Sequence, residues 1–325
     1  MSALRKADPV EQALDRVAAL KNEAAGPSVF AELRAFLKNR SNLVVAKAAK
    51  GVAHVRATEL VPDLVATFHR LMQNPAKLDK GCAATTEIVN ALYELDYVEP
   101  EIYLQGIHHV QMEGSFGPPV DAAAKLRASS ALALARTVYP AALDEVVSLL
   151  VDEWPDARIG AVRALAVNGG PAGALLLKLK ILTGESEPDV LAECFSGLLT
   201  AATERSLRLI ESFAASEEIG VAEAALLALG SSRLPEALDL LKARWERTAG
   251  GPLRKIVLLA IGMIRSDAAV EFLLALLAGC STTTAKDVLA GLAVFRDNEK
   301  IRRRVESVVA RRNEKSINET FDQQF

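Results

Sequence analysis

The chain has 325 residues, of which half are apolar and 5% are aromatic, and its formal net charge is −3. Alanine and leucine dominate the apolar residues, which favours closely packed helices over strands. The longest uncharged stretches have 14 residues, too short for the roughly 20 that a membrane-spanning helix needs. The amino terminus has no apolar signal core, so we expect a cytoplasmic protein with no membrane segment.

Charge is distributed unevenly along the chain. Residues 51–250 carry 17 basic and 27 acidic side chains, a net charge of −10, whereas the segments on both sides are net positive. A long track for nucleic acid needs the opposite sign, because it must neutralise phosphates. We therefore expect no nucleic-acid ligand, and a basic protein or peptide would fit the acidic middle.

A pair formed by a small residue and a branched apolar residue recurs along the chain. Its eight occurrences are separated by 40, 40, 33, 33, 31, 32 and 31 residues. Intervals of this length are typical of solenoids in which each repeat is one helical hairpin. We call the helix that holds the pair the first helix of its repeat. The pairs are Gly51-Val52, Ala91-Leu92, Ala131-Leu132, Ala164-Leu165, Gly197-Leu198, Ala228-Leu229, Ala260-Ile261 and Gly291-Leu292.

The predicted organisation is one all-α solenoid over residues 1–313. Residues 9–41 contain two amphipathic helices that cap the amino-terminal end, and residues 314–325 are expected to be a disordered tail because they are mostly polar. Proline at 155, 188 and 252 marks repeat boundaries, because it restricts the backbone before it. The predicted repeats are 43–79, 80–122, 123–154, 155–186, 187–218, 219–250, 251–281 and 282–313.

Two extra segments, 73–80 and 113–121, account for the two 40-residue intervals. Such insertions leave a solenoid at one edge and are frequent binding sites. In the second segment, glycines and a diproline flank Phe116, which is either packed over helix ends or presented for recognition. The candidate binding residues in this region are His108, His109, Met112, Glu113, Phe116 and Arg127.

Signatures of catalysis, metal binding and cofactor binding are missing from the sequence. His108 and His109 are expected to point about 100° apart on a helix, so they would not share a metal ion. Cys82, Cys194 and Cys280 are far apart and are expected to be buried small apolar residues. No phosphate-binding loop or nucleophile elbow occurs. We therefore expect no catalytic residue, metal or cofactor.

Two further surfaces remain open to interpretation. The second helices at 174–182 and 272–277 have more apolar positions than one buried stripe requires. Either neighbouring repeats cover them or part of the face meets a partner. Arg302, Arg303 and Arg304 make a basic cap, which is either a solvated end or a site for nucleic acid or an anionic surface.

The repeats resemble the HEAT family, and in particular the short HEAT-like repeats known from phycobilisome lyases. The segments that carry this resemblance are 163–166, 228–237 and 260–262, which follow an "A-L-G-x, then P-x-A" pattern. The resemblance implies a right-handed α-α superhelix whose first helices are convex and whose second helices line a concave surface that holds another macromolecule.

The function that follows is a non-catalytic scaffold or adaptor that binds a protein or peptide on its concave face. The alternative is an enzyme-like HEAT protein. Proteins of that kind are of two types, bilin lyase-type accessories and DNA glycosylase-type proteins that bind nucleic acid. For the first type, this chain shows no identified nucleophile. The second type requires a basic concave face rich in aromatic residues.

Overall fold

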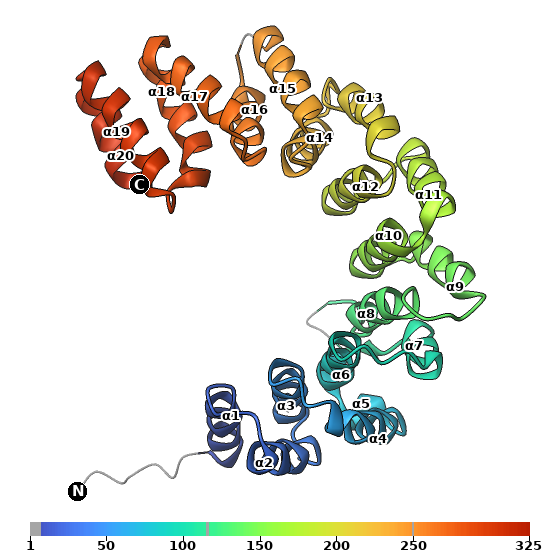
Figure 1. Cartoon of the computed structure of the whole chain (residues 1–325). Helices are drawn as coiled ribbons and strands as arrows, with labels where there is room; N and C mark the ends of the chain where they lie inside the picture. Colours follow the sequence, from blue (N-terminus) through green and yellow to red (C-terminus); the bar gives the residue numbers. More distant parts are fainter. Residues whose placement is uncertain (1–7, 115–116, 249) are drawn as a thin grey trace, which may run out of the picture. The chain divides into compact units, whose positions relative to one another are not determined.

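The computed structural model describes residues 8–114, 117–248 and 250–325 (Figure 1). These residues form α-helices that pack as neighbouring pairs, with short 3-10 helices and one two-stranded hairpin. The predicted all-α class is therefore confirmed. Packing divides the chain into two compact units, Met1–Gly169 and Gly170–Phe325, which we call unit 1 and unit 2. None of the described helices is both long and apolar enough to cross a membrane.

Unit 1 is built from a row of first helices, α1, α3, α6, α8 and α10, each packed against the next. Its helices are α1 (Pro9–Leu20), α2 (Pro27–Leu37), α3 (Asn42–His54), α4 (Val61–Met72), α5 (Pro75–Leu78), α6 (Ala83–Glu94), α7 (Pro100–Ile107), α8 (Ala124–Leu134), α9 (Ala142–Ser148) and α10 (Pro155–Asn168). The 3-10 helices are η1 (Thr58–Leu60), η2 (Lys80–Cys82) and η3 (Leu149–Val151), and the strands are β1 (Met112–Glu113) and β2 (Val120–Asp121). The hairpin was not expected from the sequence.

Unit 2 has a second row of first helices, in which α12, α14, α16 and α18 pack in succession. Its helices are α11 (Gly170–Thr183), α12 (Pro188–Ala201), α13 (Thr203–Phe213), α14 (Ile219–Ser231), α15 (Pro235–Arg247), α16 (Pro252–Met263), α17 (Asp267–Gly279), α18 (Thr282–Leu292), η4 (Ala293–Phe295), α19 (Glu299–Arg312) and α20 (Lys315–Gln324). Pro155, Pro188 and Pro252, which mark the predicted repeat boundaries, are the first residues of α10, α12 and α16.

Small residues in and next to the recurring pairs bring neighbouring first helices into close contact. A Cβ atom added at Gly262 would lie 2.1 Å from the carbonyl oxygen of Gly291, and one at Gly291 would lie 2.6 Å from that of Leu258. Because the first helices are spaced this closely, unit 2 curves toward them. The first helices α12, α14 and α16 lie on the inner side of this curve, and α11, α13 and α15 lie on its outer side (Figure 1). The expectation that second helices line the concave side is therefore wrong for these repeats.

The carboxyl-terminal residues form helix α20, so the predicted disorder of 314–325 is wrong. Asn313 has a left-handed backbone (φ 52°) that ends α19 and lets the chain turn back. Ile317 and Phe321, four positions apart, are 0% and 8% exposed because α20 packs against α18 and α19. The segment is mostly polar, and its apolar stripe, formed by Ile317 and Phe321, is short. This stripe is nevertheless sufficient to pack α20 against the last repeat.

We expect the backbone amides of α20 to be protected from hydrogen exchange. The buried contacts of Ile317 and Phe321 hold the helix closed, so its central amides should exchange at least about tenfold more slowly than their intrinsic rates. Exchange followed by mass spectrometry of peptides covering 314–325 measures this directly. The reference is the exposed turn between α11 and α12, which lies outside any helix and should exchange faster than α20. Exchange of α20 at intrinsic rates would restore the interpretation as a disordered tail.

Candidate functional site

The two ends of the insertion at 113–121 pair as the short strands β1 and β2 of a hairpin. Met112 pairs with Asp121 and Glu113 with Val120 in antiparallel register. Met112 and Val120 are 54% and 43% exposed, so the hairpin presents apolar side chains to solvent. Phe116, the predicted recognition residue, lies outside the described residues.

A buried ion-pair network anchors this hairpin to the helices of unit 1. Arg127 of α8 donates from Nη1 to Asp121 Oδ2 at 2.6 Å and from Nε to Asp152 Oδ2 at 2.9 Å. Nη1 also donates to the backbone oxygen of His109 at 2.9 Å. The side chains of Arg127 and Asp121 are 4% and 2% exposed. The prediction that Arg127 contacts a ligand is therefore corrected: its donors hold the hairpin in place from inside.

Both partners of the buried pair stay charged at neutral pH. Burial by itself raises the pKa of Asp121, but hydrogen bonds from the Gln111 and Ala123 amides and from Arg127 outweigh it and lower the pKa below its ordinary value. Burial alone lowers the pKa of Arg127, yet the two carboxylates raise it. Groups held in one protonation state serve structure and are not suited to acid–base catalysis.

The two insertions, which the sequence separates, are hydrogen-bonded to each other. The amide of Gln111 donates from Nε2 to the backbone oxygen of Asp79 at 3.0 Å, and the Glu113 carboxylate accepts from the amide of Gly81 at 2.8 Å. The carboxylate of Asp79 accepts from the amides of Ala84 and Thr85 and so caps α6. Donation from Gly81 and Gln111 lowers the pKa of Glu113. This junction was not predicted, because contacts between distant insertions leave no local signal.

The two adjacent histidines have separate partners. Helix α7 ends at Ile107, so the expectation that both lie in a helix is wrong. His108 Nε2 lies 3.0 Å from the Glu145 carboxylate, and His109 Nε2 lies 3.1 Å from Gln111 Oε1. His108 is exposed and His109 partly buried, so of the two only His108 is fully open to a partner.

The buried thiol near this network is not a nucleophile. Burial, followed by the charges of Asp79, Glu113 and Asp121, raises the pKa of Cys82 to about 12. A thiolate is the reactive form of cysteine, and at neutral pH this side chain is fully protonated. Cys194 is buried as expected, whereas Cys280 is partly exposed.

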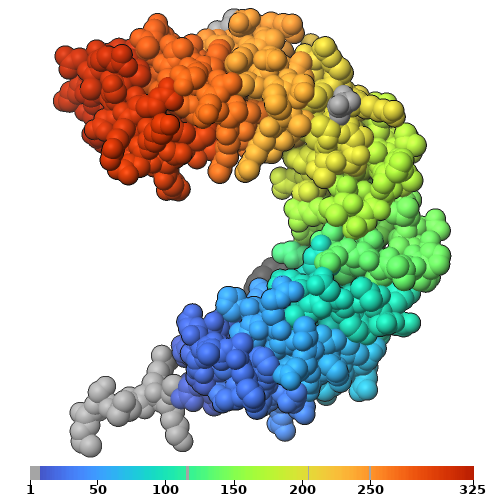
Figure 2. Space-filling model, in the orientation of Figure 1, coloured from blue at the N-terminus to red at the C-terminus, as the bar shows by residue number. Residues whose placement is uncertain are grey.

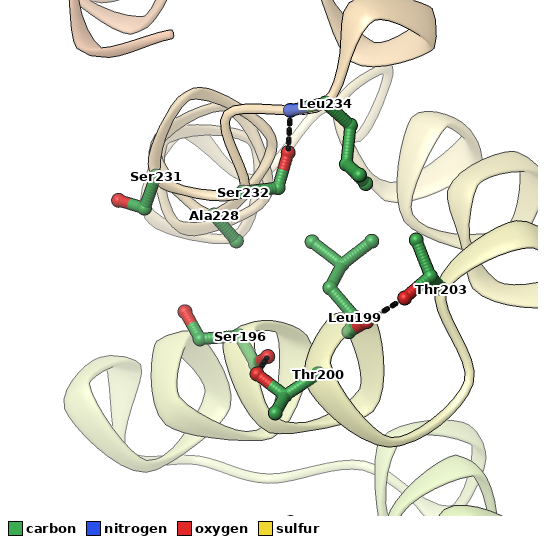
Figure 3. Close-up of a pocket in the computed structure, with 8 residues that line it drawn as sticks. All are labelled: Ser196, Leu199, Thr200, Thr203, Ala228, Ser231, Ser232 and Leu234. Carbon is green, nitrogen blue, oxygen red and sulfur yellow. Dashed lines mark hydrogen bonds between the residues drawn. The ribbon is translucent and has the colours of Figure 1, made fainter. Parts of the chain in front are cut away.

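A pocket of about 260 Å³ lies between α12 and α14 and is rich in hydroxyl groups (Figure 3). Thr200 and Thr203 donate to the backbone oxygens of Ser196 and Leu199 at 3.0 and 2.8 Å. Ser232 donates to the backbone as well and accepts from the amide of Leu234 at 3.3 Å. No ionisable side chain is among the described residues that line the pocket. Among these described lining residues, none is a base that could activate the hydroxyls.

A larger groove of about 770 Å³ runs between α11 and α13 in unit 2, and we call it the α11–α13 groove. Leu175 of α11 and Leu209 of α13 form its walls, and Leu198 of α12 lies at its base. Lys178 and Arg205, both exposed, stand at its rim. The groove combines a mostly apolar lining with two cationic groups.

Helix α11 carries a row of exposed leucines, of which Leu175 also lines this groove. Leu175, Leu179 and Leu182 are 69%, 57% and 59% exposed, and their spacing places them on one side of the helix. We call these residues the leucine stripe; α11 lies at the surface of the molecule (Figure 2). Neighbouring repeats therefore do not cover this part of 174–182. By contrast, Leu273 and Leu277 of the comparable segment 272–277 are fully buried.

The predicted basic cap is largely neutralised. Arg303 pairs with Glu299 one turn earlier on α19, and Arg304 contacts the Glu271 carboxylate at 2.7 Å. Arg302 is exposed and forms no ion pair with any described residue. Surface pairs such as these contribute little to stability, but they reduce the positive charge offered to an anionic surface.

No protein-family model and no curated protein matches this sequence. Among solved structures, an engineered protein is similar over 99% of this chain and 96% of its own, with 16% identity and a TM-score of 0.35. Human deoxyhypusine hydroxylase, solved in complex with glycerol, is similar over 79% of this chain and 91% of its own, with 18% identity and a TM-score of 0.30. The class of this protein, an all-α protein of paired helices, therefore rests on its own structure.

Proposed function

We propose that this chain is a non-catalytic scaffold that binds a protein partner through the α11–α13 groove. The observation that carries the proposal is the leucine stripe. Burying one leucine side chain stabilises a complex by about 1.5–3 kcal/mol, so three on one helix provide a strong driving force for association. Exposed apolar patches beside a groove are typical of protein interaction sites.

The occupant that we propose is an amphipathic helix of the partner with acidic residues beside its apolar face. A helix laid along α11 would place apolar side chains against the leucine stripe. Its carboxylates would then face Lys178 and Arg205, neither of which forms an ion pair with a described residue. This charge differs from the basic ligand suggested by the net charge of residues 51–250, because net charge along the sequence does not determine the charge at one groove.

The residues that could suggest catalysis are not arranged for it. No ionisable side chain is among the described residues that line the hydroxyl pocket, and Arg127, Asp121 and Asp152 beneath the hairpin are paired with one another. A bilin lyase-type or DNA glycosylase-type activity would need a nucleophile or a base in an open cleft. We therefore favour the scaffold over the enzyme-like alternative.

The double substitution Leu175→Glu and Leu179→Glu is expected to abolish partner binding. We would isolate partners from source lysate with the full chain, purify the recovered protein and measure its affinity by calorimetry. Two buried leucines correspond to a loss of at least about 100-fold in affinity, since each 1.4 kcal/mol is tenfold.

Val138→Glu is the matched control, because Val138 is apolar and 95% exposed but lies in unit 1. It should bind the partner as the unchanged protein does. If the double variant kept full affinity for every purified partner, or if nucleic acid alone were recovered, the scaffold proposal would be wrong.

A further inference from the structure

A second groove, of about 650 Å³, crosses the first helices of unit 1 and is lined by lysines. Lys21 follows α1, Lys47 and Lys50 belong to α3, and Lys125 belongs to α8. These side chains come from the amino-terminal cap and from two separate repeats, so no local motif marks them. We call this feature the lysine groove.

The positive charge of the lysine groove is mostly uncompensated. Glu87 is the acidic side chain among the lining residues, and it pairs with Lys50 at 3.0 Å. Lys21, Lys47 and Lys125 form no ion pair with any described residue. Cations gathered in a concave site focus the electrostatic field and attract an anionic ligand. They also repel one another, and a bound anion relieves that repulsion.

Apart from Thr86 and Gly81, the remaining lining residues are leucine and alanine. Leu14 of α1 and Leu43 of α3 both line the groove, and Leu43 is 56% exposed. Ala46 and Ala83 continue this surface between the lysines. The ligand that fits such a surface carries apolar groups as well as negative charges, which a free inorganic anion does not.

An acidic peptide fits the lysine groove better than nucleic acid does. Single strands are held by aromatic side chains that stack on bases, and arginine is the residue that grips phosphates in bidentate geometry. The described lining contains neither an aromatic residue nor an arginine. The groove lysines surround the exposed Leu43. A ligand in which carboxylates alternate with apolar side chains is complementary to this arrangement.

We propose that the lysine groove binds an acidic peptide segment in which carboxylates alternate with apolar residues. The lysine ammonium groups pair with the carboxylates, and Leu14 and Leu43 contact the apolar side chains. This site lies in the other unit from the α11–α13 groove and stands independently of it. The chain would then hold two ligands, one in each unit.

The test uses the full chain and a fluorescein-labelled peptide of 15 residues. In this peptide glutamate and leucine alternate, and alanine fills the remaining positions. Fluorescence anisotropy would measure its affinity for the unchanged protein and for the double variant Lys47→Glu and Lys125→Glu. We expect the variant to lose at least tenfold in affinity, and a peptide with glutamine in place of glutamate to lose as much. The affinity for the glutamate peptide should fall as salt is raised.

The matched control is Lys286→Glu with Lys300→Glu, which makes the same change in net charge at exposed positions of unit 2. It should change affinity less than twofold. Lys47→Gln with Lys125→Gln is a milder variant for use if the charge reversal prevents folding. The variant Leu175→Glu with Leu179→Glu should bind the peptide as the unchanged protein does. The proposal for the lysine groove can therefore hold even if the proposal for the α11–α13 groove is wrong.

Several results would overturn the proposal. One is equal loss of affinity in the control, and another is no binding of the glutamate peptide to the unchanged protein. Binding of a DNA oligonucleotide as tight as that of the peptide, lost in the lysine variant, would make the groove a nucleic-acid site. Self-association in sedimentation experiments that the lysine variant removes would make a second copy of the chain its occupant.

Discussion

The variant Arg127→Ala is expected to lower the free energy of unfolding by about 3–5 kcal/mol. The substitution removes the cation that Asp121 and Asp152 share, and it leaves the 2% exposed carboxylate of Asp121 without its ion-pair partner. An unpaired buried charge costs more than the pair itself contributes. The hairpin would also lose its tie to α8, because Arg127 donates to the backbone oxygen of His109. Urea denaturation followed by circular dichroism measures the loss.

Arg302→Ala is the control for this experiment, because Arg302 is exposed and outside any ion pair with described residues. Its effect should stay within about 0.5 kcal/mol. A loss below about 1 kcal/mol for Arg127→Ala would show that the network is not needed for folding.

The variant Gly262→Ala is expected to lower the free energy of unfolding by about 1–3 kcal/mol. The new methyl group would meet the Gly291 carbonyl oxygen, which lies 2.1 Å from its ideal position. Because that atom belongs to the backbone of α18, the two helices must move apart, whereas a flexible side chain could simply rotate. The shift spreads to the buried neighbours Ile261 and Leu292. Urea denaturation again gives the magnitude.

Gly220→Ala is the matched control, because Gly220 is also in a first helix of unit 2 and has no atom near the added methyl group. In an open helical position, alanine is more favourable than glycine by up to about 1 kcal/mol. The two variants should therefore change stability in opposite directions. Equal effects of the two variants on stability would mean that the close approach of α16 and α18 does not restrict the size of the side chain at position 262.

Much of the fold could be predicted from local patterns. The small–apolar pairs lie in first helices of both units, and the apolar member is buried at seven of the eight positions, with Leu132 partly exposed. The boundary prolines begin helices because proline is favoured in a first turn. Ser266 caps α17 as its residue type suggests, with its side chain accepting from the amide of Ala269.

The candidate sites were harder to predict, because exposure depends on what packs against each face. Segments 174–182 and 272–277 are similarly apolar, yet Leu175 is exposed and Leu273 is buried. The spacing of the repeats indicated an insertion at 113–121, but the ties of this region to Asp79 and Arg127 come from residues far away in sequence. The lysine groove was missed for the same reason.

The sequence by itself determined the class of fold and the order of its helices, since helix periodicity, caps and turns act over a few residues. Tertiary structure decided which helices line the inner side of unit 2, because that depends on how closely Gly262 and Gly291 bring two backbones together. It also decided that residues 315–324 form a helix and that four lysines share one groove. These features arise from contacts between distant segments, and their energies depend on burial and distance that no local pattern encodes.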